Sequence, residues 1–425
     1  THLLWGTVIM QRRLLLALWA VWAAGGAVAQ EVMPQPDVVI AGEQAPVTVP
    51  DVLSVPVTQE KTPAQIPVEI KVVETPRKEV AVSGYVKLRG LYFESTSEND
   101  PFTFRFDEWS LVLKKKLSER AEAMVAALIY GGNIFFLEHA YVDLRGMPLD
   151  ATLRLGVSRN ACFGMVPTYA NRKTTNYGIV SDMFTRDRII GIQYLARLSL
   201  FELNLGLHNG YELGRRVAGE GPVTVPFLAD RDMTFASIWR NDMDENKEYS
   251  VRIGAKPLGD RLDVGLSGSV SKLSALDTAF LANTAKLIAP TETDRTKIRN
   301  GLDFMFKPTK HSVLQAEYYT GITSTFTASA FQVLAGYTFT EADKPYVSVY
   351  ARYGEVNPHC PADPLNSYTW KLSQTVLSAV WRFTPGAQLQ LEYEVNGEKD
   401  AGTDAAGTAV KAVNDVVFLE LVFFY

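Results

Sequence analysis

The sequence predicts an all-β fold, a transmembrane antiparallel up-and-down β-barrel of about 16 strands. Three observations support this prediction: an export signal at the N-terminus, no later apolar run long enough for a membrane helix, and a regular alternation of strand-like segments with turns. The chain has 425 residues, 47% hydrophobic and 21% charged, and barrels reach this length as single units. The mild net charge of -5 gives no indication of a nucleic-acid partner.

The first 29 residues have the pattern of a secretory signal peptide. Two arginines precede an apolar run over residues 14–24, and residues 27–29 (AVA) supply the small side chains of a cleavage site. We expect the natural protein to start at Met10, with residues 1–9 as upstream read-through, and to be cleaved after Ala29. A transmembrane anchor is the alternative, but the apolar run is short for a span of about 20 residues.

Residues 30–80 differ in composition from everything that follows. They contain eight of the 21 prolines, no aromatic residue and a single glycine. Proline fixes its own φ and restricts the residue before it, so repeated Val-Pro steps favour extended, unpacked backbone. We predict a Pro/Val-rich periplasmic extension, and a tether to the cell wall or to a partner is its functional alternative.

Residues 81–425 repeat a pattern of strand, turn, strand and loop, which predicts the barrel domain. The number of predicted strands is even, as in bacterial single-chain barrels. They cover residues 82–94, 103–116, 121–130, 134–145, 151–161, 187–196, 200–211, 246–257, 261–273, 296–307, 311–322, 329–340, 345–355, 368–384, 387–396 and 414–425.

The links between these strands fall into two classes. Every second link is tight, and the remaining links are mostly longer and polar, which is typical of short periplasmic turns and longer external loops. A soluble β-sandwich has no reason to sort its links in this way. The tight links lie at 118–120, 147–150, 258–260, 308–310 and 385–386, and the long ones at 162–186, 212–245, 274–295, 356–367 and 397–413.

The last strand shows most clearly which face meets lipid. In residues 416–425 (VVFLELVFFY), Val417, Leu419, Leu421, Phe423 and Tyr425 fall on one face, and Glu420 falls on the other. An aromatic residue at the end of such a strand resembles the insertion signal of outer-membrane barrels, so the assembly machinery of that membrane is an expected partner. Aromatic residues near both ends of the strands predict two belts at the lipid–water interfaces, with outer-membrane lipid and lipopolysaccharide around the barrel.

Charged residues in the strands are expected to point into the barrel. An arginine facing lipid near mid-membrane costs about 2–4 kcal/mol, so the interior is favoured. Barrels of this size leave an aqueous channel. The inward basic candidates are Lys87, Arg89, Arg154, Arg252, Lys297, Arg299, Arg352 and Arg382, and the acidic ones are Asp143, Asp263, Asp303, Glu317, Glu392 and Glu420.

Three segments resemble the phosphate-selective porin O and P family. They are residues 139–145 (HAYVDLR), 153–158 (LRLGVS) and 187–193 (DRIIGIQ), and the resemblance covers about residues 134–195. It implies a homotrimer of 16-stranded barrels in the outer membrane, with passage of phosphate or other anions in some members. The chain departs from the family after Ser158, where RNAC replaces a Gln/Lys-x-Pro-Phe-Gly segment, and it has no dense series of arginines.

The linker 163–186 is the third external loop, which in porins generally folds into the barrel and narrows it. Arg172, Lys173, Arg186 and the nearby Arg188 outnumber the acids Asp182 and Asp187. Basic side chains at a constriction favour anions, so we expect a weak anion preference. The alternative is that these are simply solvated loop charges.

Other residues give weaker indications. Cys162 and Cys360 could form a disulfide between external loops or remain two free thiols. The histidines at 139, 208, 311 and 359 form no recognisable Ser-His-Asp grouping, so no enzyme is expected. Acids 242, 244 and 245 lack EF-hand spacing, and neither a metal nor a cofactor is expected.

The sequence therefore predicts an outer-membrane pore for passive diffusion of small hydrophilic solutes. Two alternatives remain at this point. One is a structural outer-membrane anchor whose N-terminal extension contacts the cell wall, and the other is a substrate-specific uptake channel.

Overall fold

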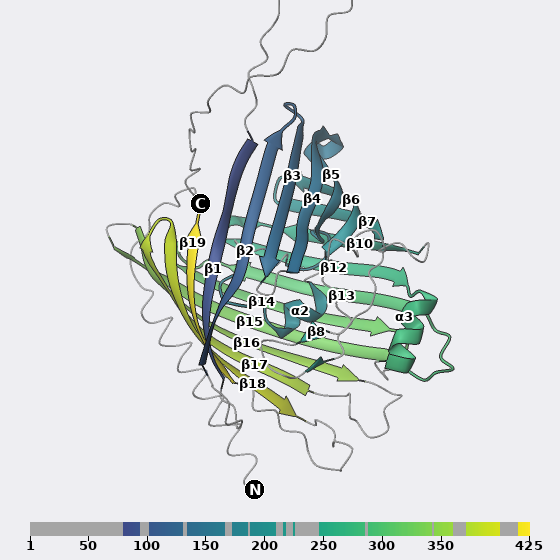
Figure 1. Ribbon diagram of the computed structural model, residues 1–425. Helices are drawn as coiled ribbons and strands as arrows, with labels where there is room; N and C mark the ends of the chain where they lie inside the picture. Colours follow the sequence, from purple (N-terminus) through teal and green to yellow (C-terminus); the bar gives the residue numbers. More distant parts are fainter. Residues whose placement is uncertain are drawn as a thin grey trace, which may run out of the picture.

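The computed structural model describes residues 80–93, 102–130, 134–165, 172–185, 188–209, 216–217, 224–225, 246–284, 288–341, 344–359, 371–399 and 415–425. Sixteen antiparallel strands close into a barrel because the first strand, β1, pairs with the last, β19 (Figure 1). The predicted signal peptide and residues 30–79 of the predicted extension lie outside the described residues.

Each predicted strand corresponds to one strand of the barrel, which confirms the predicted fold class. The barrel strands are β1 (Val80–Phe93), β2 (Phe102–Lys116), β3 (Ala121–Tyr130), β4 (Ile134–Met147), β5 (Ala151–Arg159), β6 (Arg188–Leu198), β7 (Phe201–Asn209), β10 (Lys247–Ala255), β12 (Leu262–Lys272), β13 (Thr296–Phe306), β14 (Ser312–Thr323), β15 (Phe326–Glu341), β16 (Lys344–His359), β17 (Lys371–Thr384), β18 (Ala387–Lys399) and β19 (Val416–Phe424).

Short elements lie in the connections. They are η1 (Pro148–Asp150), α2 (Ile179–Phe184), the paired β8 (Arg216–Val217) and β9 (Thr224–Val225), β11 (Pro257–Asp260), α3 (Ala275–Ala279) and η3 (Phe280–Thr284). Ser274 caps α3, because its hydroxyl accepts from the backbone N–H of Asp277 while the Asp277 carboxylate accepts from the backbone N–H of Ser274. Among the described residues, no helix is both long enough and apolar enough to cross a membrane.

Tight links join the strands at one end of the barrel, which we call the turn end. Most links at the other end, the loop end, are longer, and the link between β14 and β15 is an exception. At the turn end, β6 and β7 are separated by two residues, of which Ser199 has a positive φ of 55°. The sequence expected a link of several residues between β14 and β15, but both strands extend until only Ser324 and Thr325 separate them. Ser324 makes this turn with a φ of 56°, and its N–H donates to the Thr296 carbonyl oxygen at 2.7 Å.

The exterior is apolar along the strands. Leu266 is 62% exposed and Tyr249 is 59% exposed, whereas the neighbouring side chains of Glu248 and Ser250 are buried. The same alternation holds in β19, where Leu419 is 40% exposed and Glu420 only 1%. Side chains of successive strand residues point to opposite faces, so this pattern places apolar groups outside and polar groups inside. The predicted faces of the last strand are confirmed.

The connection between β5 and β6 is the third link at the loop end, and part of it enters the barrel. Its helix α2 is completely buried and contacts β15 and β16, on the far side of the barrel from β5 in strand order (Figure 1). The main apolar core of the molecule therefore lies inside the barrel, between α2 and the strand wall.

Candidate functional site

The barrel interior contains an apolar cluster beside its buried charged residues, and the sequence analysis did not predict this cluster. We call the inner faces of β13–β17, together with α2, the sealed wall. Helix α2 contacts β15 and β16, and the apolar side chains between the helix and these strands are shielded from water. The members of this buried cluster are Phe163, Ile179, Val180, Met183, Phe184, Leu273, Leu281, Ala282, Ile288, Tyr319, Phe326, Ala328, Ala330, Val356 and Leu372.

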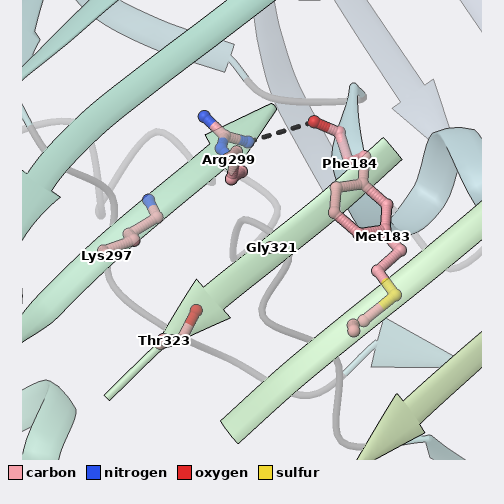
Figure 2. Close-up of a pocket in the computed structure, with 7 residues that line it drawn as sticks. Met183, Phe184, Lys297, Arg299, Gly321 and Thr323 are labelled. Atoms are coloured by element: carbon pink, nitrogen blue, oxygen red, sulfur yellow. Dashed lines mark hydrogen bonds between the residues drawn. The ribbon is translucent and has the colours of Figure 1, made fainter. Parts of the chain in front are cut away.

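Helix α2 is seated by stacking and by a backbone contact. The ring of Phe184 stacks on Tyr319 with 5.5 Å between centroids. The Arg299 guanidinium donates through Nη1 to the Phe184 carbonyl oxygen at 3.0 Å, as Figure 2 shows. Met183, Lys297 and Arg299 line a small gap between this helix and the strands (Figure 2). Since a helix C-terminus carries unpaired carbonyl groups, Arg299 supplies the donor that α2 lacks there.

Arg352 holds the segment that precedes α2. Its guanidinium donates to the Asn176 carbonyl oxygen at 2.9 Å, to Gln374 Oε1 at 2.8 Å and to the Thr174 hydroxyl. Two acids of β18 support the same segment, because Glu392 accepts from the backbone N–H of Thr175 at 2.7 Å and Glu394 accepts from the Asn176 side chain. The loop is thus attached to β16, β17 and β18.

Most of the predicted inward charges are buried in ion pairs of the wall. Arg252 lies 3.1 Å from the Asp263 carboxylate and also pairs with Asp303, while Lys297 and Arg299 pair with Glu248. On β1, Lys87 and Arg89 pair with Glu420 and with Asp107. Glu317 and Glu392 are also buried. Taking a charge out of water is costly unless an opposite charge is close, as it is in the ion pairs of Lys87, Arg89, Arg252, Lys297 and Arg299.

The remaining predicted residues differ in exposure. Arg188 is buried, with Nη2 3.9 Å from Glu138 Oε2, and Arg382 donates to the Ser348 hydroxyl at 2.9 Å. Arg172 and Lys173 are half-buried on the third loop. Arg186 and Asp187 lie outside the described residues, as do the acids at 242, 244 and 245.

Solvent reaches part of the inner faces of β2–β7, and we call these faces the open wall. In three of its ion pairs the basic side chain is more exposed than its acidic partner, whereas Arg159 and Arg188, at 2% and 0%, are less exposed than their partner Glu138 at 11%. The side-chain exposures are 51% for Arg145 against 30% for Glu122, 66% for Arg197 against 17% for Glu202, and 20% for Arg154 against 11% for Asp143. Near the loop end, Arg105 is likewise more exposed than Asp107. At Arg105, Arg145, Arg154 and Arg197 the cation is therefore the partner nearer to solvent.

The contact between His208 and Ser250 was not expected from the sequence. His208 Nε2 lies 3.4 Å from the Ser250 hydroxyl, while His208 Nδ1 lies 3.1 Å from its neighbouring carbonyl oxygen at Asn209. Both side chains are buried, so no solute reaches this pair in the structure. Cys162 is a buried free thiol in the loop, and burial raises its pKa to about 12. Cys360 lies outside the described residues.

No family model matches the sequence. No curated protein matches it either. Among the residues that the structure describes, no group of three His, Cys, Asp or Glu side chains is arranged to hold a metal ion.

Solved structures do share the architecture. OprB of Pseudomonas putida aligns with a TM-score of 0.57 and 11% identity, over 82% of this chain and 94% of that one. OmpF of Salmonella typhi, in complex with daunomycin, gives 0.55 and 10% over 82% and 98% of the two chains. OmpT of Vibrio cholerae, in a variant without loop L8, gives 0.51 and 12% over 82% and 99%.

The barrel has the fold of outer-membrane porins. Its apolar exterior is stable only in lipid, and its closed hydrogen bonding leaves no unpaired strand edge there. The chain is therefore an outer-membrane β-barrel. At these low identities the likeness concerns the fold alone, and the resemblance to the phosphate-selective O and P family is not confirmed by any match.

Proposed function

We propose that this barrel is a passive diffusion pore for small hydrophilic solutes, with a weak preference for anions. The observation that carries the proposal is the unequal exposure of charge at Arg145, Arg154 and Arg197 of the open wall, where the arginine is more exposed than its acidic partner. A mobile ion responds mainly to the charges nearest to it, because water screens those that lie deeper. Counting the acidic and basic residues of the sequence does not reveal this difference in exposure.

The third loop adds to the positive potential. Arg172 and Lys173 are half-buried on the part of the loop that enters the barrel. A basic constriction raises the local concentration of anions and lowers that of cations. Of the predicted site residues, we therefore assign selectivity to Arg154, Arg172 and Lys173, and structural roles to the buried Lys87, Arg89, Arg252, Arg299 and Arg352.

Planar-bilayer recordings test this proposal. In a KCl gradient, the reversal potential of the refolded protein is expected to have the sign of an anion-preferring pore. Replacing Lys173 by Glu should lower the anion-to-cation permeability ratio by about two- to fivefold, since a unit charge at close range in water interacts by about 1 kcal/mol. Lys272→Glu, at an exposed position of β12, is the matched control and should leave the ratio unchanged. Cation preference of the unmodified protein would refute the anion assignment.

We also propose which lipids surround the barrel and how many copies assemble. We place outer-membrane lipid and lipopolysaccharide around its exterior, and we propose a homotrimer after cleavage behind Ala29. In support, one form of Vibrio cholerae OmpT that shares the fold, with a TM-score of 0.50, is described as a trimer. Mass measurement of the purified protein in detergent should give three copies, and a single copy would contradict this part.

A further inference from the structure

Arginines and aromatic rings alternate along β4, β5 and the third loop. Arg172 Cζ lies 5.0 Å from the centroid of the Tyr177 ring, and Arg159 Cζ lies 5.5 Å from the same centroid. Further along, His139 meets Tyr141 edge to face at 5.7 Å, and Arg154 Cζ lies 3.9 Å over the Tyr141 ring. We name this set the Arg–aromatic row: Arg172, Tyr177, Arg159, His139, Tyr141 and Arg154.

The pairing of β4 with β5 sets the lower part of the row. Tyr141 lies opposite Gly156, and Asp143 lies opposite Arg154. Asp143 accepts two hydrogen bonds from Arg154, at 2.8 and 2.9 Å, which fixes the guanidinium plane over the neighbouring Tyr141 ring. The ring is held as well, because the Tyr141 hydroxyl lies 2.9 Å from Met124 Sδ.

Exposure separates the row from other contacts of the same chemistry. Arg159 is buried and paired with Glu138, but the other five members are half-buried and in reach of interior water. Arg89 over Phe418 and Arg299 over Phe163 are also guanidinium–ring contacts, yet all four of these side chains are buried. The row is thus the part of this chemistry that a passing solute can touch.

We propose that the Arg–aromatic row is a transit track for organic anions that carry a planar ring, such as aromatic carboxylates. A guanidinium donates two parallel hydrogen bonds to a carboxylate, and tyrosine, histidine and guanidinium faces stack on planar rings. Several weak sites in series let a solute move from one to the next without being trapped. Chloride and phosphate use only the charges. This inference rests on the proposed pore function and names the solute class that benefits most.

Block of the chloride current measures the track. Potassium benzoate or potassium cyclohexanecarboxylate, which have equal charge and similar size, is added to one side of a bilayer that contains the full chain in KCl. We expect benzoate to halve the current at a concentration about fivefold lower, because ring stacking is available only to the planar anion. Phosphate is expected to behave like cyclohexanecarboxylate or weaker.

A Tyr141→Leu, Tyr177→Leu double variant keeps apolar volume and every arginine but removes two rings. It should lose the difference between the two carboxylates while retaining its KCl conductance and reversal potential. Tyr318→Leu, on the lipid-facing side of β14, is the matched control and should keep the difference. Heat-modifiable migration on gels verifies that each variant is folded. If the double variant does not fold, the single variant Tyr177→Leu takes its place.

Equal half-blocking concentrations in the unmodified protein would overturn the track, as would a folded double variant that still distinguishes the two anions. A barrel that conducts no KCl at all would instead overturn the pore, and the track with it. The two failures are therefore distinguishable in the same recordings.

Discussion

The sealed wall and the open wall are built from different strands with the same alternation of inward and outward side chains, yet the inward side chains have different surroundings. On β15 the inward residues Ala328 and Ala330 are small and lie under α2. On β4 and β5 the inward residues Tyr141 and Arg154 are large and half-buried, with nothing of α2 above them. The third loop therefore decides which of these inward side chains are covered.

The largest expected effect concerns the anchor of the sealed wall. Arg352→Met removes a buried cation and leaves Glu392 and Glu394 buried without it, so the free energy of unfolding should fall by about 3–5 kcal/mol. Urea titration of the refolded protein measures this change. Arg382→Met on β17 is the control, because Arg382 is half-exposed and should cost about 1 kcal/mol. A loss of under about 1 kcal/mol for Arg352→Met would mean that the loop is held by other contacts.

A smaller effect is expected from the seat of α2. Phe184→Ala empties the space over Tyr319. The free energy of unfolding should fall by about 3 kcal/mol, the lower end of the range for truncating a buried phenylalanine, because the loop can relax into part of the cavity. The same variant should raise the single-channel conductance, since the helix is no longer fixed against the wall. Ile192→Ala, on the lipid-facing side of β6, controls for lost apolar volume. Unchanged conductance with lower stability would show that α2 does not limit the pore.

The smallest effect is expected on the open wall. Arg197→Gln removes an exposed ion pair with Glu202 at 3.0 Å, and such pairs contribute less than about 1 kcal/mol. The loss of stability relative to the unmodified protein should be smaller at high salt than at low salt, because screening weakens exposed ion pairs. Stability measured at two ionic strengths is the readout. A loss above about 2 kcal/mol that salt does not reduce would mean that the open wall is as tightly sealed as the other.

Much of the barrel was predictable from local patterns. Alternation along each strand placed Arg154 and Asp143 on the inner face, and the structure pairs them. The apolar lining of the sealed wall was missed because apolar residues were assigned to lipid throughout. A signal for it exists in β16, where Arg352 must point inward and the period of two then places Val356 inside and Glu355 outside.

The sequence alone determined the number of strands, the sorting of turns and loops, and the lipid-facing side of most strands, because these depend on neighbours within a few residues. Only the tertiary structure decided which inward charges meet water. That choice depends on contacts such as Arg352 with Asn176, which lie 176 residues apart in the chain, and on the inward seat of α2. A local sequence pattern does not predict a contact between residues so far apart in the chain. The exposure of side chains inside the barrel therefore follows only from the closed fold.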